Sequence, residues 1–177
     1  MINRKNSLLC ILIFLLSSCS SLTKNNPSLL SKTKNELTTL QTSTPEIPVY
    51  KKFNCIQSSE DFETGYIFEV IDGDSIKAKI DGKIYEIRYI GINTPEYYSD
   101  KKAEAERATL ENRRLVEGKK VYLFKDKSNT DKFQRLLRYV FTDEYFVNYE
   151  LVKRGLAESK SYFPDNSCQL IFNQAIR

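Results

Sequence analysis

The sequence predicts a mainly β domain of the α+β class, built as a closed five-stranded β-barrel with three helices. Three observations lead to this prediction. Five short β-forming segments lie between residues 65 and 141, one run of helix-forming residues interrupts them after the third, and helical patterns follow the last. The length of 177 residues makes a single domain with a modest core the default expectation.

The strands are identified by short runs rich in β-branched and aromatic residues, bounded by turn residues. Between the second and third run, Asp81-Gly82 is a dipeptide that strongly favours a two-residue hairpin turn. We therefore expect strands at residues 66–71, 75–80, 84–90, 120–125 and 136–141.

The helices are identified by composition and by the residues that end them. Residues 103–117 are mostly good helix formers, and Gly118 follows where a helix would stop. A second, short helix is expected at residues 148–154, before Gly155. Residues 167–177 carry apolar side chains at helical spacing without a capping residue, so we expect a third helix that is cut short. Five strands with one helix after the third suggest a barrel of the OB type.

The N-terminal residues do not have the composition of a folded domain. Arg4 and Lys5 precede an apolar run at residues 8–16, which is shorter than the roughly 20 residues of a membrane-spanning helix but suits a secretory signal. The run ends in a Leu-Ser-Ser-Cys tetrapeptide that resembles the lipobox of bacterial lipoproteins, in which Cys19 would carry the lipid. An uncleaved anchor and an ordinary signal peptide are the alternatives, and both also imply export.

This interpretation divides the chain into three parts. Residues 1–18 form the expected lipoprotein signal peptide. Residues 19–50 form a flexible tether, because they are rich in Ser, Thr, Asn, Lys and Pro and contain few large apolar residues. Residues 51–177 form the folded domain. The protein is therefore expected to be exported and lipid-anchored to the bacterial cell envelope, at the cell surface or facing the periplasm.

The four cysteines have separate expected fates. Cys10 leaves with the signal peptide and Cys19 takes the lipid, so Cys55 and Cys168 remain as an even pair in an oxidising compartment. A disulfide between them is expected, with two free thiols as the alternative. The chain contains no histidine, so a zinc site is not favoured.

The net charge is only +4, and loss of the signal peptide with Arg4 and Lys5 lowers it to +2. The distribution of charge is more informative, because residues 119–138 are strongly basic. Such a segment suits a phosphate backbone, although an ordinary solvated strand and loop is the alternative. The basic residues are Lys119, Lys120, Lys125, Lys127, Lys132, Arg135 and Arg138.

Three separate segments combine carboxylates with arginines. Residues 72–74 (Asp-Gly-Asp) taken alone predict a turn, because Asp and Gly are common turn residues. Arg88 is expected on a strand face between apolar neighbours, where pairing with Glu86 is the alternative to a functional role. Glu96 follows Asn-Thr-Pro and is expected on a loop, where catalytic groups are often found. Arg135 opens the fifth strand after a basic loop.

These segments resemble, in order and with compatible spacing, the three signature segments of the staphylococcal nuclease family. They are residues 70–75 (VIDGDS), 88–96 (RYIGINTPE) and 130–135 (TDKFQR), and residues 147–157 resemble the helix that follows the barrel in that family. The similarity covers roughly residues 65–177. It implies a five-stranded OB barrel with three helices, and its active members are calcium-dependent nucleases that act on DNA and RNA.

The resemblance also implies roles for individual residues. Asp74, Asn93 and the backbone carbonyl of Thr94 would bind Ca²⁺, Glu96 would act as general base, and Arg88 and Arg135 would bind the scissile phosphate, with Arg135 also near the departing 5′ oxygen. Lys132, Phe133 and Tyr162 would contact the nucleic acid. The chemistry agrees, because calcium prefers oxygen ligands, arginine matches phosphate, and a chain without histidine needs another base.

Two residues depart from the family pattern. Asn93 stands where the family commonly has aspartate, so one negative charge is missing from the proposed calcium ligands and we expect weaker calcium binding. Gln134 stands where a small residue is usual, and crowding of the loop before Arg135 is one hypothesis for its effect, which the sequence leaves open.

Three hypotheses for function follow. The first is an active, calcium-dependent nuclease at the cell envelope that acts on DNA, RNA or both. The second is a catalytically weak or inactive OB-type lipoprotein that only binds nucleic acid. The third, a structural lipoprotein that uses its barrel for protein contacts, leaves the charged segments unexplained. No pattern typical of a dimer interface is present, so a monomer is expected.

Overall fold

The computed structural model describes residues 47–56 and 60–176. The predicted signal peptide, the lipid-bearing Cys19 and nearly all of the predicted tether lie outside these residues, so they stay predictions. Within the described ranges, no helix is both long enough and apolar enough to span a bilayer.

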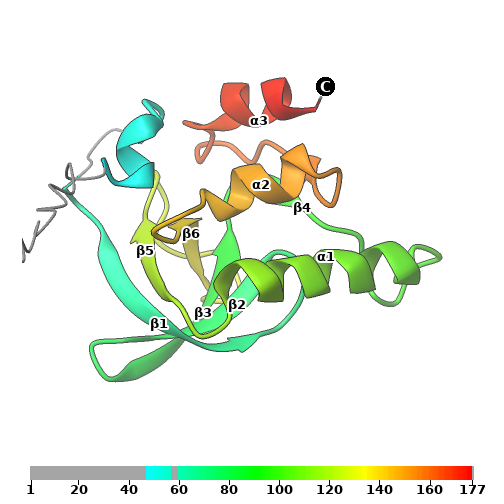
Figure 1. The fold of residues 1–177 in the computed structure, drawn as a ribbon, viewed down its shortest axis with the longest axis horizontal. Helices are drawn as coiled ribbons and strands as arrows, with labels where there is room; N and C mark the ends of the chain where they lie inside the picture. Colours follow the sequence, from blue (N-terminus) through cyan, green and yellow to red (C-terminus); the bar gives the residue numbers. More distant parts are fainter. Residues whose placement is uncertain (1–46, 57–59, 177) are drawn as a thin grey trace, which may run out of the picture. The chain divides into compact units, whose positions relative to one another are not determined.

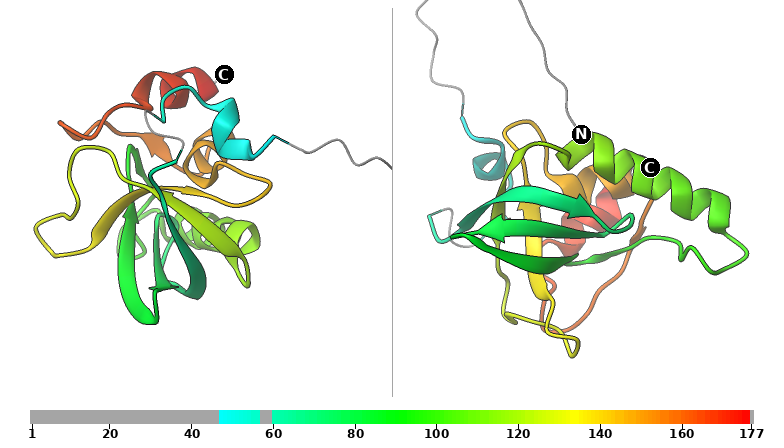
Figure 2. Two further views of the ribbon diagram at one scale, coloured as in Figure 1. Left: turned by 90° about the vertical axis from the view of Figure 1, so that its left-hand side faces the viewer. Right: turned by 90° about the horizontal axis from the view of Figure 1, so that it is seen from below.

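A closed barrel of five strands forms the centre of the fold (Figures 1 and 2). The strands follow the order β1-β2-β3-β6-β5, and all neighbours are antiparallel except β3 and β6, which run parallel. The predicted five-stranded barrel is confirmed, and the strands differ from their expected bounds by only a few residues. They are β1 (Glu63–Val70), β2 (Ser75–Ile80), β3 (Lys83–Tyr89), β5 (Lys120–Phe124) and β6 (Leu136–Phe141).

The turn between β2 and β3 has the predicted Asp-Gly geometry. Asp81 and Gly82 have φ angles of 46° and 84°, the positive values that a type I′ hairpin requires at both central residues. The turn fixes a register in which Ser75 lies opposite Arg88. A slip by one residue would move Arg88 to the other face of the sheet, so this turn helps to position the site described below.

Three helices pack around the barrel, as predicted (Figure 1). They are α1 (Lys102–Val116), α2 (Val147–Lys153) and α3 (Gln169–Ala175). α2 and α3 lie above the barrel in Figure 1, whereas the N-terminal half of α1 projects past it. The C-terminal half of α1 buries Leu115 completely, and Gly118 follows with a φ of 70°, which suits its predicted position after the helix.

Two small elements were not predicted. A 3-10 helix, η1 (Val49–Lys52), precedes the barrel, and a two-stranded sheet joins β4 (Ile92–Asn93) to β7 (Glu158–Ser159). Each strand of this sheet has only two residues, which is too short for a recognisable sequence period. The small sheet matters for function because it holds Asn93 against the segment that leads to Tyr162.

The hydrophobic core fills the barrel and continues beneath the helices. Ile76, Ile87 and Val140 are fully buried inside it. Phe141 on β6 stacks on Phe146 just before α2, with ring centroids 4.1 Å apart, so packing extends from the barrel to the helices. Burial of each such side chain contributes roughly 1.5–3 kcal/mol to stability.

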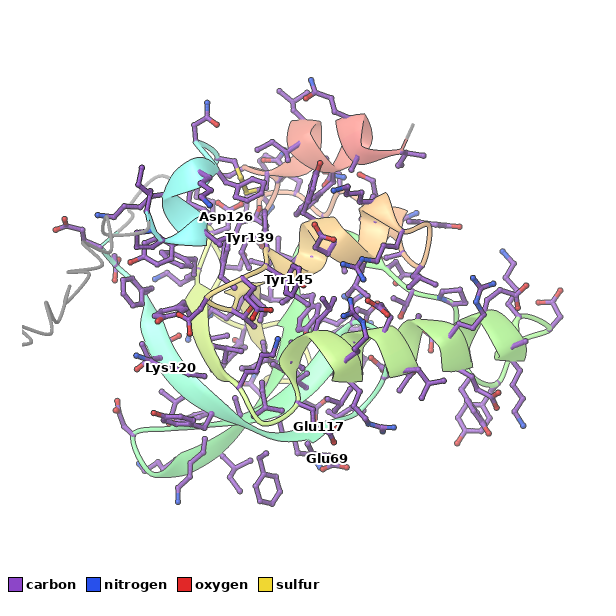
Figure 3. All side chains as sticks on the ribbon, in the orientation of Figure 1. Glu69, Glu117, Lys120, Asp126, Tyr139 and Tyr145 are labelled. Atoms are coloured by element: carbon purple, nitrogen blue, oxygen red, sulfur yellow. A yellow bond between two sulfur atoms is a disulfide. The ribbon has the colours of Figure 1, made fainter. Side chains whose placement is uncertain are left out.

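A disulfide and a group of hydrogen bonds attach the C-terminal segment to the barrel. Cys55 and Cys168, the pair left by the cysteine count, form a disulfide with their Cα atoms 4.9 Å apart. Beside it, the Tyr139 hydroxyl donates to Asp126 at 2.9 Å, and Figure 3 shows these two residues next to each other near η1. The N–H and hydroxyl of Ser167 also donate to Asp126. These contacts fix the point at which α3 begins.

Candidate functional site

A pocket of about 390 Å³ lies beside the C-terminal end of β3 and collects most of the predicted site residues. Of the nine residues with a predicted catalytic, metal-binding or nucleic-acid-binding role, six line it: Asp74, Arg88, Asn93, Glu96, Arg135 and Tyr162. Three further carboxylates, Asp72, Asp131 and Asp165, also line it. Segments that are distant in the sequence therefore converge on one site.

The Asp-Gly-Asp segment is the tight turn between β1 and β2, and it also contributes to the pocket. The backbone N–H of Asp74 donates to the side chain of Asp72 at 3.0 Å, an arrangement typical of Asp in turns. A Cβ at Gly73 would lie 2.7 Å from the Thr94 side chain and 2.8 Å from that of Ala108. Only glycine therefore allows the turn to pack this closely against the Thr94 segment.

The carboxylate of Asp74 is held at the base of the pocket. It is 5% exposed, and one oxygen accepts hydrogen bonds from the N–H and the hydroxyl of Thr94 at 2.7 and 3.0 Å. Burial raises the pKa of Asp74, and the nearby Asp72 adds to this effect, although Arg88 and the hydrogen bonds from Thr94 oppose it. A carboxylate in this environment favours any cation that lies beside it.

Arg88 provides one such cation. Its guanidinium lies 3.2 Å from Asp74 and donates hydrogen bonds to Asn93 Oδ1 at 3.0 Å and to the carbonyl of Tyr89 at 2.8 Å. The alternative pairing with Glu86 is wrong, because the register of β3 directs Arg88 toward the Asp-Gly-Asp turn on the neighbouring strand. Glu86 instead lies 3.9 Å from Arg135.

The three predicted calcium ligands lie next to one another. Within the described ranges, no three His, Cys, Asp or Glu side chains are grouped to hold a metal ion, so any cation here would also need amide and backbone oxygens. Asn93 and Thr94 supply these, and calcium accepts such mixed oxygen ligands. The Asn93 side chain accepts a hydrogen bond from Arg88 through its oxygen and donates one from its amide nitrogen to the Thr94 carbonyl at 3.3 Å. These oxygen ligands therefore fit calcium, which would compete with Arg88 for Asp74 and Asn93.

Arg135 is positioned by Asp131, a residue to which the sequence assigned no role. Asp131 accepts hydrogen bonds from the Phe133 N–H at 2.8 Å, the Arg135 N–H at 3.0 Å and the Arg135 guanidinium at 2.8 Å. Burial alone would raise the pKa of Asp131, but these hydrogen bonds from Arg135 and Phe133 outweigh it and lower the pKa. Asp131 therefore stays charged and holds Arg135 in place.

Lys132 and Phe133 lie on the exposed loop beside the pocket rather than in its lining. The Phe133 ring is 67% exposed, and the Lys132 ammonium and the Arg135 guanidinium lie 5.0 and 5.6 Å from its centroid. Gln134 is exposed. It adopts a φ of 67°, a left-handed conformation that glycine takes without strain.

Glu96 lies where the chain leaves the pocket on an exposed loop. Its carbonyl accepts hydrogen bonds from the N–H of Ser99 at 3.2 Å and from the Ser99 hydroxyl at 2.7 Å, which hold the loop. Among the residues that the structure describes, none forms a hydrogen bond or ion pair with the Glu96 carboxylate. This carboxylate is therefore open to solvent at the edge of the pocket.

Tyr162, in the segment after β7, also lines the pocket. Its ring is 51% exposed. The buried Asp165 closes the turn behind it and accepts hydrogen bonds from the N–H groups of Lys127 and Ser128 at 2.9 and 2.7 Å. No recognisable motif surrounds Asp165, so this supporting role could not be predicted from the sequence.

The basic residues of segment 119–138 do not all lie on one solvated, phosphate-accessible face. Arg138 is only 2% exposed, and its guanidinium donates to Glu63 at 2.6 Å and to the Asn129 side chain at 2.9 Å. Lys119 pairs with Glu144 at 3.4 Å. Counting Lys and Arg along the sequence assumes that each side chain is solvated. In the structure, some of them instead form ion pairs with carboxylates.

Asn112 on α1 supports the site and was not identified from the sequence. Its side chain is fully buried, accepts a hydrogen bond from the Tyr89 hydroxyl at 2.8 Å and donates to the carbonyl of Asp72 at 2.8 Å. Burial raises the pKa of Tyr89, so its hydroxyl remains protonated and able to donate. Asn112 therefore connects α1 and β3 to the turn that carries Asp74.

We expect Asn112→Ala to lower the free energy of unfolding by about 1–3 kcal/mol, because the change leaves the buried Tyr89 hydroxyl and the partly buried Asp72 carbonyl without partners. Urea denaturation measures this effect. Arg107→Ala, at an exposed position on the same helix, is the matched control and should leave the unfolding midpoint nearly unchanged. Equal midpoints for the two variants would show that Asn112 is dispensable.

Comparisons with known proteins identify relatives that span most of this fold. Residues 86–174 match the family described as staphylococcal nuclease homologue. The chain is 34% identical over 121 residues to the thermonuclease of Staphylococcus hyicus, covering 67% of this chain and 72% of that protein. It is 31% identical over 116 residues to the thermonuclease of Staphylococcus intermedius (64% and 69%), and 37% identical over 101 residues to endonuclease YncB of Bacillus subtilis (55% and 48%).

Proposed function

This chain belongs to the staphylococcal nuclease family, and we propose that it is a calcium-dependent nuclease that hydrolyses phosphodiester bonds of DNA or RNA at the bacterial cell envelope. One observation carries the proposal: Arg88, Glu96 and Arg135 converge with Asp74 on a single pocket. The pocket thus combines two cations for a phosphate with a free carboxylate.

The two arginines would hold the scissile phosphate from different elements. Arg88 lies on β3, and Arg135 lies at the start of β6 with its guanidinium fixed by Asp131. Guanidinium groups match phosphate oxygens and stabilise the negative charge that grows in the transition state. Carboxylate or amide oxygens already hold both guanidinium groups in position. The arginine side chains therefore need to move little when a phosphate binds.

Glu96 would accept the proton of the attacking water. Its carboxylate is exposed and lines the same pocket as both arginines. The chain contains no histidine, so a carboxylate is the available base at this site. On this assignment Arg135 assists the departing 5′ oxygen, so that cleavage leaves a 3′-phosphate on one product and a 5′-hydroxyl on the other.

Calcium would be held by the oxygens of Asp74, Asn93 and Thr94. When bound, it supplies positive charge that polarises the phosphate and lowers the pKa of water. Burial raises the pKa of Asp74 even with Arg88 beside it, so a calcium ion at this position would further favour the charged form of the carboxylate. Asn93 binds more weakly than an aspartate because an amide carries no net charge.

We expect Asn93→Asp to lower the Kd for calcium by about tenfold, which corresponds to about 1.4 kcal/mol. The new carboxylate adds a negative charge beside Asp74 and also competes for Arg88. We therefore expect a change in calcium affinity rather than in folding stability. Calorimetric titration with CaCl₂, in the absence of nucleic acid, measures this change without relying on activity.

Asn54→Asp is the matched control, because it adds the same charge at an exposed position next to the disulfide. Its calcium affinity should equal that of the wild type. If Asn93→Asp and Asn54→Asp have the same Kd, Asn93 is not a calcium ligand.

Analysis of the products tests the proposed reaction. A single-stranded DNA and an RNA of the same sequence are incubated with the protein and calcium, and the new ends are examined. We expect 5′-hydroxyl ends, which accept a labelled phosphate from polynucleotide kinase without prior phosphatase treatment. Ends that require phosphatase treatment would show that the opposite bond is cut and that the role of Arg135 is wrong.

A binding module without catalysis is the second candidate, and one observation favours it. Asn93 replaces a charged ligand and its oxygen is occupied by Arg88 at 3.0 Å, so the calcium site could be too weak to support hydrolysis. Binding of the same DNA without any new ends would favour this candidate.

The envelope location rests on two kinds of support. The disulfide is typical of a protein that folds in an oxidising compartment outside the cytoplasm. The lipid anchor at Cys19 rests only on the resemblance to a lipobox, and a monomeric state likewise rests on sequence pattern alone.

A further inference from the structure

A second groove, of about 570 Å³, lies between α1 and the loop that follows Thr94. Its lining shares three residues with the pocket described above: Asp72, Asp74 and Glu96. The two depressions therefore adjoin each other, and Glu96 belongs to both. A nucleic-acid strand that binds in the first pocket must continue beyond Glu96. This groove provides one path for it.

The groove presents apolar and aromatic surface to solvent. Tyr98 is 98% exposed, Tyr97 is partly exposed, and their rings form an edge-on pair with centroids 5.5 Å apart. Ile71 and Leu110, also exposed, line the same groove. Neither tyrosine belongs to the hydrophobic core, so folding does not account for two adjacent rings at this position.

The charge of the groove shows which part of a nucleotide it could accept. Four of its lining residues are carboxylates (Asp72, Asp74, Glu96 and Glu106), whereas Arg113 is the one cation among the lining residues within the described ranges. Carboxylates repel phosphates but not uncharged nucleobases. Bases also stack on exposed aromatic rings with little dependence on their identity.

The direction of the strand follows from the assignment of the leaving group. In-line displacement places the attacking water and the departing 5′ oxygen on opposite sides of the phosphorus. The nucleoside that departs with its 5′ oxygen then lies on the side of Arg135 and Tyr162. The nucleoside joined through its 3′ oxygen must lie elsewhere, and the groove beyond Glu96 is next to the reacting phosphate.

We propose that this groove binds the nucleoside on the 5′ side of the scissile phosphate, with its base stacked on one ring of the Tyr97–Tyr98 pair and against the edge of the other. The inference rests on the proposed nuclease function and adds a substrate-binding subsite to it. Tyr97 and Tyr98 contact the base and take no part in the chemical step. The Lys102 ammonium lies 4.7 Å from the Tyr97 ring centroid, which helps to hold that ring in place.

The test compares two substrates that each contain one cleavable bond. The first is a dithymidylate with a 3′-phosphate, and the second has an abasic tetrahydrofuran in place of its 5′ thymidine. We expect Tyr97→Ala/Tyr98→Ala to lower kcat/KM about 5- to 100-fold for the first substrate, the range expected from loss of base stacking, and to leave the second unchanged. The wild type should prefer the first substrate by a similar factor.

Tyr97→Phe/Tyr98→Phe is the matched control, because it keeps the rings and should keep the preference. Loss of the preference in this control, or an equal loss on both substrates in the alanine variant, would overturn the stacking subsite. Equal cleavage of both substrates by the wild type would overturn it as well. Absence of any cleavage by the wild type would instead overturn the nuclease function on which the subsite depends.

Discussion

Glu96→Gln is expected to reduce kcat for cleavage of single-stranded DNA by about 10²- to 10⁴-fold, the contribution typical of a positioned general base. The amide has nearly the same shape as the carboxylate but cannot accept the proton of water. Because Glu96 is exposed and has no partner among the described residues, the change removes no contact that stabilises the fold. The affinity for DNA should stay nearly unchanged, since both arginines remain.

Single-turnover cleavage and equilibrium binding of the same labelled oligonucleotide measure these two effects separately. Glu104→Gln provides a matched control, because it makes the same change at an exposed position on α1, outside both grooves. Unchanged turnover in Glu96→Gln would exclude Glu96 as the base. A parallel loss of binding and cleavage would assign it to substrate affinity instead.

Removal of the disulfide is expected to cause the largest loss of stability. Cys55 and Cys168 are separated by 113 positions, and the chain-entropy model gives about 4–5 kcal/mol for a loop of this length. The bond also holds the segment that carries Tyr50 and Phe53 on the barrel, where Phe53 packs edge-on against Phe146 at 4.9 Å. Loss of the bond should therefore loosen this aromatic contact as well.

Guanidinium denaturation of the wild type and of Cys55→Ala/Cys168→Ala measures this effect. The variant should have a lower midpoint, and dithiothreitol should lower the midpoint of the wild type to a similar value. Dithiothreitol should have no effect on the variant, which controls for other actions of the reductant. Equal midpoints for oxidised wild type and variant would show that the cross-link contributes no stability.

The barrel could be predicted from the sequence because its signals are local. Short runs rich in β-branched and aromatic residues mark the strands, and the Asp81-Gly82 turn fixes the hairpin without reference to the rest of the chain. The sheet formed by β4 and β7 could not be predicted, because each strand contributes two residues and the pairing spans more than sixty positions. Its partner strand becomes evident only when the chain after α2 is placed in space.

The site could be predicted only in part, for the same reason. Sequence and resemblance identified Arg88, Glu96 and Arg135, but the contacts that hold them come from residues in other elements. Asn112 reaches the Asp72 carbonyl across 40 positions in the chain, and a single Asn in a helix carries no signal of this kind. Arg138 shows the opposite error, because charge counted along the chain does not reveal burial.

The central claim, calcium-dependent hydrolysis, is tested most directly by incubating purified full-length protein with single-stranded DNA in CaCl₂ and, in parallel, in the chelator EGTA. We expect cleavage in calcium, none in EGTA, and recovery when excess calcium is added to the chelated sample. Cleavage that persists in EGTA would contradict the metal requirement, and binding without cleavage in calcium would contradict the assignment as a nuclease.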